Sequence, residues 1–132
     1  MVKKILVITA LLAMMVSRSV RADDDFEYLT KCVQAEAGIE DIKGKRLVAA
    51  VILNRVEDER FPDTITEVID EPKQFAVVAN GRIKKVEADE ETVLACKLEL
   101  LKRTDSEIFY FNNSPKISGK FCYRWGNHYF AK

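Results

Sequence analysis

An unbroken run of seven apolar residues, Leu47 to Leu53, constrains the fold of this chain more than any other feature of its sequence. The run lies within residues 43–57, which we expect to form a helix. A helix that is apolar on every side has to be buried on nearly every side. Ala49 and Ala50 lie within the run, and their small side chains allow another backbone to come close. We therefore expect the rest of the domain to cover this helix.

Three other segments have the patterns of helices. Residues 24–37 and 88–103 carry apolar residues at helical spacing. A capping box, in which Thr64 and Glu67 satisfy each other's backbone N–H groups, predicts a short helix that ends near Ile69. The apolar positions are Phe26, Leu29, Val33 and Ala37 in the first segment and Val93, Leu94, Leu98 and Leu101 in the last.

Residues 74–87 have a different pattern, which predicts a β-hairpin. Two candidate strands, residues 74–79 and 82–87, flank the dipeptide Asn80-Gly81. Asn-Gly is favoured in type I′ turns because both central residues need a positive φ. The 132 residues, 48% of them hydrophobic, are enough for one domain with a real core. The fold class that we predict is α+β, with helices around one small hairpin.

The N-terminal segment, residues 1–22, has the order of a secretory signal peptide. Two lysines precede a twelve-residue apolar run, residues 5–16, and small residues follow at the cleavage positions. Twelve residues are too few to span a bilayer as a helix, which needs about 20. Two arginines lie unusually close to the cleavage site, so an uncleaved anchor is the alternative. We expect a mature domain of residues 23–132 that is secreted or held in the cell envelope, without a membrane anchor.

The charge of the mature domain argues against a nucleic-acid partner. Residues 1–22 contain four basic residues and no acids, so residues 23–132 have 17 basic and 21 acidic residues and a net charge of −4. Nucleic-acid binding depends on a basic surface. If the substrate is cell wall, its binding depends on hydrogen bonds and stacking.

The cysteines and the single histidine give no metal-binding pattern. Cys32, Cys96 and Cys122 are widely spaced, without a short Cys-x-x-Cys unit, and His128 is the only histidine. We expect no metal and no other cofactor. An odd number of cysteines leaves at least one thiol unpaired after export. The cysteines are interpreted as small buried residues; one disulfide is the alternative, and the sequence does not choose its pair.

Glu36 is placed where a charged carboxylate is disfavoured. It lies near the end of the first predicted helix, where the macrodipole is negative, and Gly38 follows as a residue that could end the helix. On a helical wheel it adjoins the apolar stripe of Leu29, Cys32 and Val33. Partial burial and the helix end both raise the pKa of a carboxyl group. A carboxyl group still protonated near neutral pH can act as general acid on a glycosidic bond. A glutamate that is paired with a lysine or solvated is the alternative.

Six stretches of the sequence resemble, in order, the catalytic domain of spore-cortex-lytic enzymes, the SleB/CwlJ-type cell-wall hydrolases: "QAEAGIE", "GKRLVAAVILNRV", "RFPDTITEVI", "QFAVVANG", "YFNN" and "GNHYFAK". The resemblance covers the chain from about residue 28 to its end. It implies a mostly helical, lysozyme-like fold with a small hairpin at the cleft. It also implies peptidoglycan glycan strands as substrate and Glu36 as the catalytic acid/base. The family looks like lytic transglycosylases, which cut between N-acetylmuramic acid and N-acetylglucosamine and leave a 1,6-anhydro end.

The number of candidate acids agrees with that chemistry. An ordinary glycosidase needs two carboxylates at the bond, whereas a transglycosylase can use one. Glu40 is the best candidate for a second acid, but its direction beyond Gly38 is not predicted. A muramidase-type hydrolase and an N-acetylmuramoyl-L-alanine amidase are alternatives, although an amidase needs several zinc ligands. A non-catalytic wall-binding module is the alternative of another class.

Five other residues are candidate substrate contacts within the matched stretches. Gln74 and Phe75 are expected to line the cleft at the start of the hairpin. Tyr110 and Asn112 share one face of a predicted strand, where a tyrosine can stack on a sugar and an amide can bind an acetamido group. His128 is expected to contact the substrate. The alternatives are an ordinary strand start, core aromatic packing and a structural histidine.

We find no separate peptidoglycan-binding module in this sequence, although longer relatives often have one. A spore role is therefore one of two interpretations. The protein acts either in general wall remodelling or in germination with an accessory protein that supplies targeting.

Overall fold

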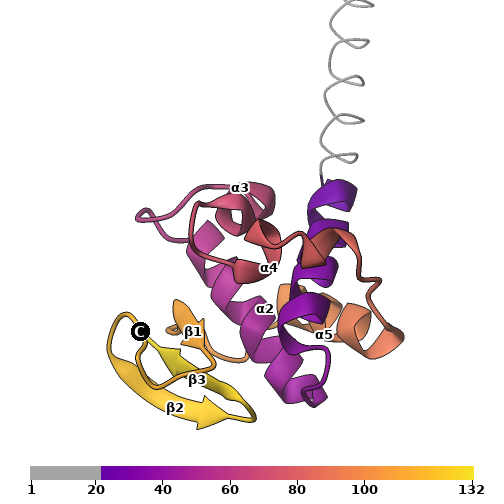
Figure 1. Ribbon diagram of the computed structural model, residues 1–132. Coiled ribbons are helices and arrows are strands. Elements are labelled where there is room, and N and C mark those ends of the chain that lie inside the picture. Colours follow the sequence, from indigo (N-terminus) through magenta and orange to yellow (C-terminus); the bar gives the residue numbers. More distant parts are fainter. Residues whose placement is uncertain (1–21) are drawn as a thin grey trace, which may run out of the picture.

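The computed structural model describes residues 22–132, in which helices come first and a small antiparallel sheet follows (Figure 1). The predicted signal peptide lies outside this part of the chain except for its last residue. No helix in residues 22–132 is both long and apolar enough to cross a membrane. The elements are a helix over residues 22–37, α2 (Ile42–Val56), α3 (Ile65–Asp70), α4 (Ala76–Ala79), the 3₁₀ helix η1 (Arg82–Lys84), α5 (Glu90–Leu101), β1 (Tyr110–Asn112), β2 (Phe121–Trp125) and β3 (His128–Ala131).

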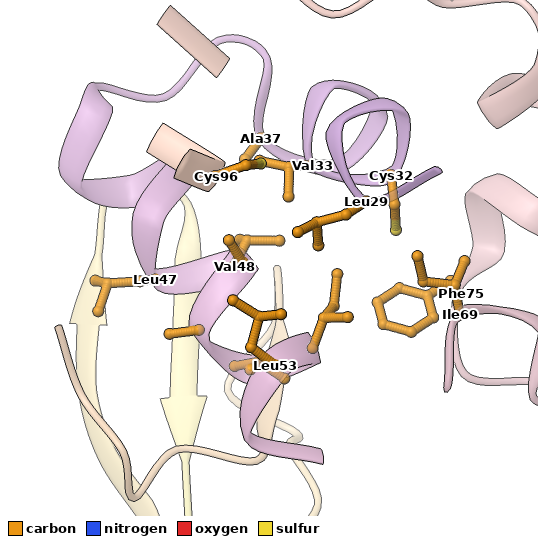
Figure 2. Packing of buried hydrophobic residues seen from close by; sticks show 14 of the residues in the cluster. Leu29, Cys32, Val33, Ala37, Leu47, Val48, Leu53, Ile69, Phe75 and Cys96 are labelled. Atoms are coloured by element: carbon orange, nitrogen blue, oxygen red, sulfur yellow. The ribbon is translucent and has the colours of Figure 1, made fainter. Parts of the chain in front are cut away.

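Helix α2 is the centre of the fold, as its apolar run predicts. Every residue from Leu47 to Leu53 is buried. The helix packs against α5, α3 and β1, and its side chains meet those of the first helix, where Leu29 and Val33 lie beside Val48 (Figure 2). Full burial of one such aliphatic side chain contributes roughly 1.5–3 kcal/mol to folding.

The helix starts are fixed by polar side chains that accept backbone hydrogen bonds. The Thr64 hydroxyl oxygen accepts a hydrogen bond from the Glu67 N–H at 3.1 Å, so the predicted start of α3 is confirmed. Asp41 caps α2 and Asp89 caps α5 in the same way. A side-chain cap of this kind contributes about 1 kcal/mol.

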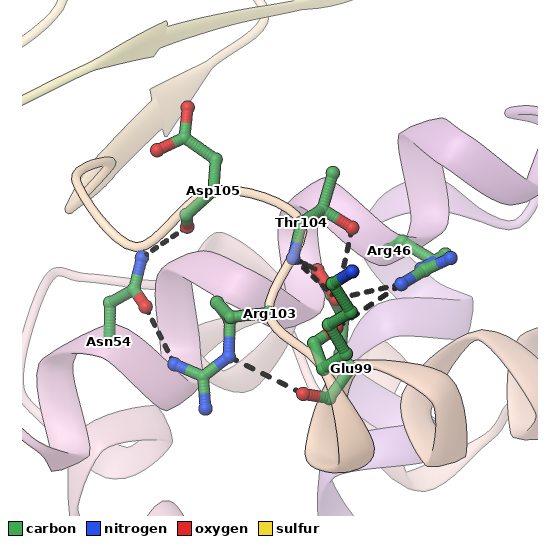
Figure 3. A network of polar contacts seen from close by, with 7 residues as sticks. Arg46, Asn54, Glu99, Arg103, Thr104 and Asp105 are labelled. Carbon is green, nitrogen blue, oxygen red and sulfur yellow. Dashed lines mark hydrogen bonds and ion pairs between the residues drawn. The ribbon is translucent and has the colours of Figure 1, made fainter.

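A buried glutamate ties the end of α5 to the chain that leads into the sheet. Glu99 is fully buried, and its carboxylate accepts hydrogen bonds from the Thr104 N–H at 2.9 Å and from the Thr104 hydroxyl at 3.0 Å (Figure 3). Arg46 of α2 lies 3.4 Å from the same carboxylate. Because a buried charge is stable only when it is paired and hydrogen-bonded, these contacts fix how α5 ends.

Asn54 of α2 ties the same connection to the central helix. Its Nδ2 donates to the carbonyl oxygens of Asp105 and Ile108, both at 2.8 Å, and its Oδ1 accepts from Arg103 at 2.6 Å (Figure 3). A buried amide whose donor and acceptor are both used holds the backbone before β1 against α2.

The sheet has the strand order β1-β3-β2, and both pairs are antiparallel. Strands β2 and β3 form a hairpin in which Trp125 pairs with His128. On the other side of β3, Asn112 of β1 pairs with Tyr129. The helical content and the small sheet confirm the predicted α+β class.

The predicted hairpin over residues 74–87 is wrong. This segment forms α4 and η1, and the Asn-Gly pair ends α4 instead of joining two strands. Gly81 has a φ of 75°, but Asn80 has a φ of −88°. A type I′ turn needs a positive φ at both residues, whereas one left-handed glycine is the usual end of a helix. The hairpin of this fold lies at residues 121–131 instead.

The three cysteines are free thiols. Cys32 and Cys96 are buried in the core, as their interpretation as small buried residues predicts, and Cys122 is half-buried. Burial, with a smaller contribution from Glu99, raises the pKa of Cys96 to about 12. A buried thiol with a raised pKa is unreactive, so the structure offers no catalytic cysteine in residues 22–132.

Candidate active site

Glu36 is the next-to-last residue of the first helix, and its side chain is half-buried between two buried alanines, Ala35 and Ala37. Loss of hydration raises the pKa of the Glu36 carboxyl group, and the positive charge of Arg82 lowers it by a smaller amount. The negative end of the helix macrodipole acts in the same direction as burial. The predicted setting of Glu36 is therefore confirmed.

Glu36 lies in a cleft of about 400 Å³ that brings together residues distant in the sequence. One wall comes from the end of the first helix and from α4 and η1. The opposite wall comes from the end of β1 and the start of β3. The lining residues are Ala35, Glu36, Gln74, Ala76, Val77, Asn80, Arg82, Phe111, Asn112, Asn113 and His128.

Glu36 is the only carboxylic acid among the cleft-lining residues in the part of the chain that the structure describes. Glu40, the candidate second acid, lies elsewhere: its carboxylate is 6% exposed and accepts a hydrogen bond from the Asn127 N–H at 3.1 Å. Glu40 thus supports the turn between β2 and β3. The cleft offers one acid, not a facing pair.

Gln74 is held from below by a buried arginine. Arg55 of α2 is 4% exposed, and its Nη1 donates to Gln74 Oε1 at 3.2 Å. The Nε of the same guanidinium donates to the Phe109 carbonyl oxygen at 2.7 Å. Because Arg55 is bonded to the backbone that enters β1, it fixes Gln74 relative to the sheet.

Asn112 and His128 bring the sheet into the cleft. Asn112 Nδ2 donates to the Lys116 carbonyl oxygen at 3.1 Å. His128 packs edge-on against Phe111, with ring centroids 5.3 Å apart. Its Nδ1 is buried without a hydrogen-bond partner and lies 3.9 Å from Glu40 Oε1. Burial lowers the pKa of His128 more than Glu40 raises it, so the neutral ring is favoured.

Two predicted cleft residues lie outside the cleft. Phe75 is 4% exposed and packs in the core, with its ring 5.9 Å from that of Phe111. The segment that holds Phe75 starts a helix instead of a strand, which turns the ring inward. Tyr110 does share the face of Asn112, but it lies at the far end of β1, where its ring packs against Arg55 and Phe61.

The sequence did not point to Asn80 and Arg82, which line the cleft from the segment around Gly81. Their position next to a turn glycine was visible, but the hairpin interpretation placed them at a strand connection. Phe111 was passed over because strand alternation directed attention to its neighbours.

No group of three or more histidine, cysteine or acidic side chains within residues 22–132 is arranged to hold a metal ion. His128 is the only histidine of the chain. Its nearest acidic neighbour is Glu40, which already accepts a backbone hydrogen bond.

The Cell Wall Hydrolase family matches residues 39–131, most of the length of the chain. The chain belongs to this family. The predicted resemblance is therefore confirmed. The family match begins three residues after Glu36, so the evidence for Glu36 itself is its geometry.

Curated relatives of this cell wall hydrolase are spore cortex-lytic enzymes. The enzyme of Halalkalibacterium halodurans is 37% identical over 101 residues, which are 74% of this chain and 30% of the relative. The enzyme of Bacillus subtilis is 34% identical over 119 residues, which are 84% of this chain and 38% of the relative. The chain thus spans less than half the length of these relatives.

Solved structures of two SleB catalytic domains have the same fold. The catalytic domain of the germination-specific lytic transglycosylase SleB from Bacillus anthracis has a TM-score of 0.71 and 30% identity, and the match covers 82% of this chain and 93% of that domain. The catalytic domain of Bacillus cereus SleB also has a TM-score of 0.71, with 30% identity. The chain therefore matches nearly the whole of a catalytic domain.

Proposed function

We propose that this protein is a lytic transglycosylase that cleaves the glycan strands of peptidoglycan between N-acetylmuramic acid and N-acetylglucosamine. The observation that carries the proposal is the single acid of the cleft, Glu36, with its raised pKa. Membership of the cell wall hydrolase family and the likeness to a domain named as a lytic transglycosylase support the same activity.

The reaction needs only one carboxyl group. Protonated Glu36 donates its proton to the glycosidic oxygen as the bond from that oxygen to C1 of the muramic acid breaks. The Glu36 carboxylate then takes the proton of the 6-hydroxyl group of the same sugar, while the hydroxyl oxygen bonds to C1. The product has a 1,6-anhydro end, Glu36 is protonated again, and no water is consumed.

The lining residues have roles that agree with this sequence of steps. Arg82 stabilises the Glu36 carboxylate after it has donated its proton, since its charge lowers the pKa of that group. Gln74, Asn112 and His128 offer polar atoms to the sugars. Phe75 and Tyr110, which lie outside the cleft, act only by supporting its walls.

A two-carboxylate hydrolase is the main alternative, and the position of Glu40 argues against it. A hydrolase needs a second carboxylate on the other side of the bond to activate water or to attack the sugar. The Glu40 carboxylate is buried against the β2–β3 turn instead.

Mass spectrometry of the fragments released from purified sacculi tests the proposal. A transglycosylase releases muropeptides with 1,6-anhydro ends, a muramidase releases reducing ends, an amidase releases free peptides, and a wall-binding module releases nothing. We expect anhydro ends. Any of the other three outcomes would replace the proposed activity.

The same assay tests Glu36 directly. Glu36→Gln keeps the size of the side chain but cannot carry the proton, so turnover should fall by at least roughly 10²–10⁴-fold, the usual contribution of general acid–base catalysis. Glu40→Gln is the matched control and should cost far less. If both folded variants are inactive, a two-carboxylate mechanism is the better account.

The cellular setting is part of the proposal. Cleavage of residues 1–22 would deliver the domain to the cell envelope, where peptidoglycan is found. Spore cortex is one substrate and vegetative wall is the other, and an accessory protein would supply targeting in germination.

A further inference from the structure

The two amide side chains of the cleft have their orientations fixed by their partners. An arginine has only hydrogen-bond donors, so the atom of Gln74 that faces Arg55 has to be its oxygen. That contact is 3.2 Å long and comes from a guanidinium that is 4% exposed. The Gln74 amide therefore presents its NH₂ group, a donor, to the cleft.

Asn112 has the opposite orientation. A carbonyl oxygen only accepts hydrogen bonds, so the atom of Asn112 that faces the Lys116 carbonyl, at 3.1 Å, has to be its NH₂ group. The carbonyl oxygen of the Asn112 amide, an acceptor, remains for the cleft. The helical wall thus offers a donor, and the sheet wall offers an acceptor.

We propose that Gln74 and Asn112 together form a subsite for a secondary amide, the N-acetyl group of a substrate sugar. The carbonyl oxygen of that group accepts from Gln74 Nε2, and its N–H donates to Asn112 Oδ1. A hydroxyl group or a protonated amine does not match both ends, because an ammonium group has three donors and no acceptor. This inference rests on the proposed function, since it names what the same cleft recognises.

Arg55 is the positioning residue of this subsite. Its guanidinium lies among the rings of Phe61 and Tyr110, at 5.1 and 5.4 Å from their centroids, and is bonded to the Phe109 carbonyl oxygen. Gln74 cannot turn its NH₂ group toward Arg55 without placing a donor against a donor. The core of the protein therefore determines which polar group the substrate meets.

Gln74→Glu tests the subsite without disturbing Arg55. The new carboxylate keeps an oxygen against Arg55 but replaces the donor in the cleft with a second oxygen. The measurement is the kcat/KM for release of anhydro ends from N-acetylated glycan strands and from strands with the acetyl groups removed. The wild-type protein should prefer acetylated strands by about tenfold or more. In Gln74→Glu this ratio should fall to about one or below, because a carboxylate attracts the free ammonium group.

Asn80→Asp is the matched control for charge. Asn80 lines the same cleft, and its Oδ1 accepts from the Arg82 N–H at 2.9 Å, a contact that aspartate retains. This variant adds the same charge but should keep the preference for acetylated strands. An unchanged ratio in Gln74→Glu, or an equal fall in both variants, would overturn the subsite.

Two further measurements complete the test. Strands deacetylated only at N-acetylglucosamine or only at N-acetylmuramic acid identify the sugar whose acetyl group is bound, and equal kcat/KM on both and on intact strands would also overturn the subsite. If the wild-type protein releases no glycan fragments, the proposed function fails. Binding of acetylated and deacetylated oligosaccharides to the wild type and Gln74→Glu then still tests the subsite, with the same expected change of preference.

Discussion

At the scale of single residues, the acid of this cleft is held between two opposite influences. Burial raises the pKa of Glu36, and Arg82 lowers it by less. The first keeps the proton available for donation, and the second limits the cost of the carboxylate that follows. An acid that has to give up and regain one proton in each turnover benefits from both.

Arg82→Gln should move the alkaline limb of the pH–activity profile to higher pH. The acid form of Glu36 is the active form in the first step, so activity is present below its pKa and falls as pH rises through it. Removal of the Arg82 charge raises that pKa further. The measurement is the kcat for release of anhydro ends across pH. Lys84→Gln, a charge removal outside the cleft lining, should leave the limb in place; a shift to lower pH in Arg82→Gln would contradict the assignment.

The same pKa shift gives Glu36 a defined effect on stability. Because its pKa is higher in the folded state than in the unfolded state, the folded state binds the proton more tightly between the two values. Stability from this group is present below the unfolded pKa and is lost as pH rises through the folded pKa. In denaturation experiments the Glu36→Gln variant should therefore gain stability relative to wild type as pH rises through that interval.

The site residues divide according to how much of their setting is local. Glu36 was predictable because helix position and apolar spacing alone place it at a half-buried helix end. Gln74, Asn112 and His128 were found by resemblance, and all three line the cleft. Arg82 was missed because its role depends on how η1 lies against the first helix, which no spacing within the sequence encodes.

At the scale of elements, the helices with a clear apolar period were predictable and the shortest ones were not. The helix over residues 22–37, α2 and α5 lie within two residues of their predicted bounds. Helix α4 has four residues and η1 has three. Neither completes two turns, so no apolar period can distinguish them from strands. The Asn-Gly pair then favoured the wrong alternative.

Two glycines with positive φ separate backbone strain from crowding. Gly81 has a φ of 75°, and a Cβ there would meet no atom within 4 Å. Gly119 has a φ of 79°, but its Cβ would lie 2.1 Å from the Lys132 carbonyl oxygen. That oxygen accepts from the Lys120 N–H, so a methyl group at residue 119 pushes apart the pairing that holds the C-terminus.

Gly81→Ala should therefore cost about 1 kcal/mol of unfolding free energy, the strain of a left-handed residue alone. Gly119→Ala should cost roughly 2–5 kcal/mol, because overpacking adds to the same strain. Chemical denaturation of both variants and the wild type measures the difference. Equal losses would show that the loop at residue 119 moves aside freely.

At the scale of the whole molecule, one helix carries both the core and the assembly of the cleft. The apolar half of α2 is covered on all sides by the other elements, while Asn54 and Arg55 at its end bind the backbone that enters the sheet. The acid comes from the helical part, and His128 and Asn112 come from the sheet. The width of the cleft is therefore set by polar contacts that only a fully folded domain makes.

The domain also has a start that tolerates removal of what precedes it. Residues 22–24 are exposed, and the first fully buried residue is Leu29. A chain that begins at Asp23 keeps every buried residue of the core. Cleavage after Ala22 is thus compatible with the folded domain, as a signal peptide requires.

Exported protein should begin at Asp23 and should be found outside the membrane fraction. The charged, apolar and small-residue order of residues 1–22 is that of a cleaved signal peptide, and the acidic mature domain has no basic surface segment to hold it on an anionic membrane. N-terminal sequencing of the extracellular and membrane fractions of a secreting host measures the outcome. Ala22→Phe, which places a bulky residue at the cleavage position, should instead accumulate uncut on membranes. If the unaltered protein retains Met1 in the membrane fraction, the segment is an anchor, and the enzyme works at the membrane surface.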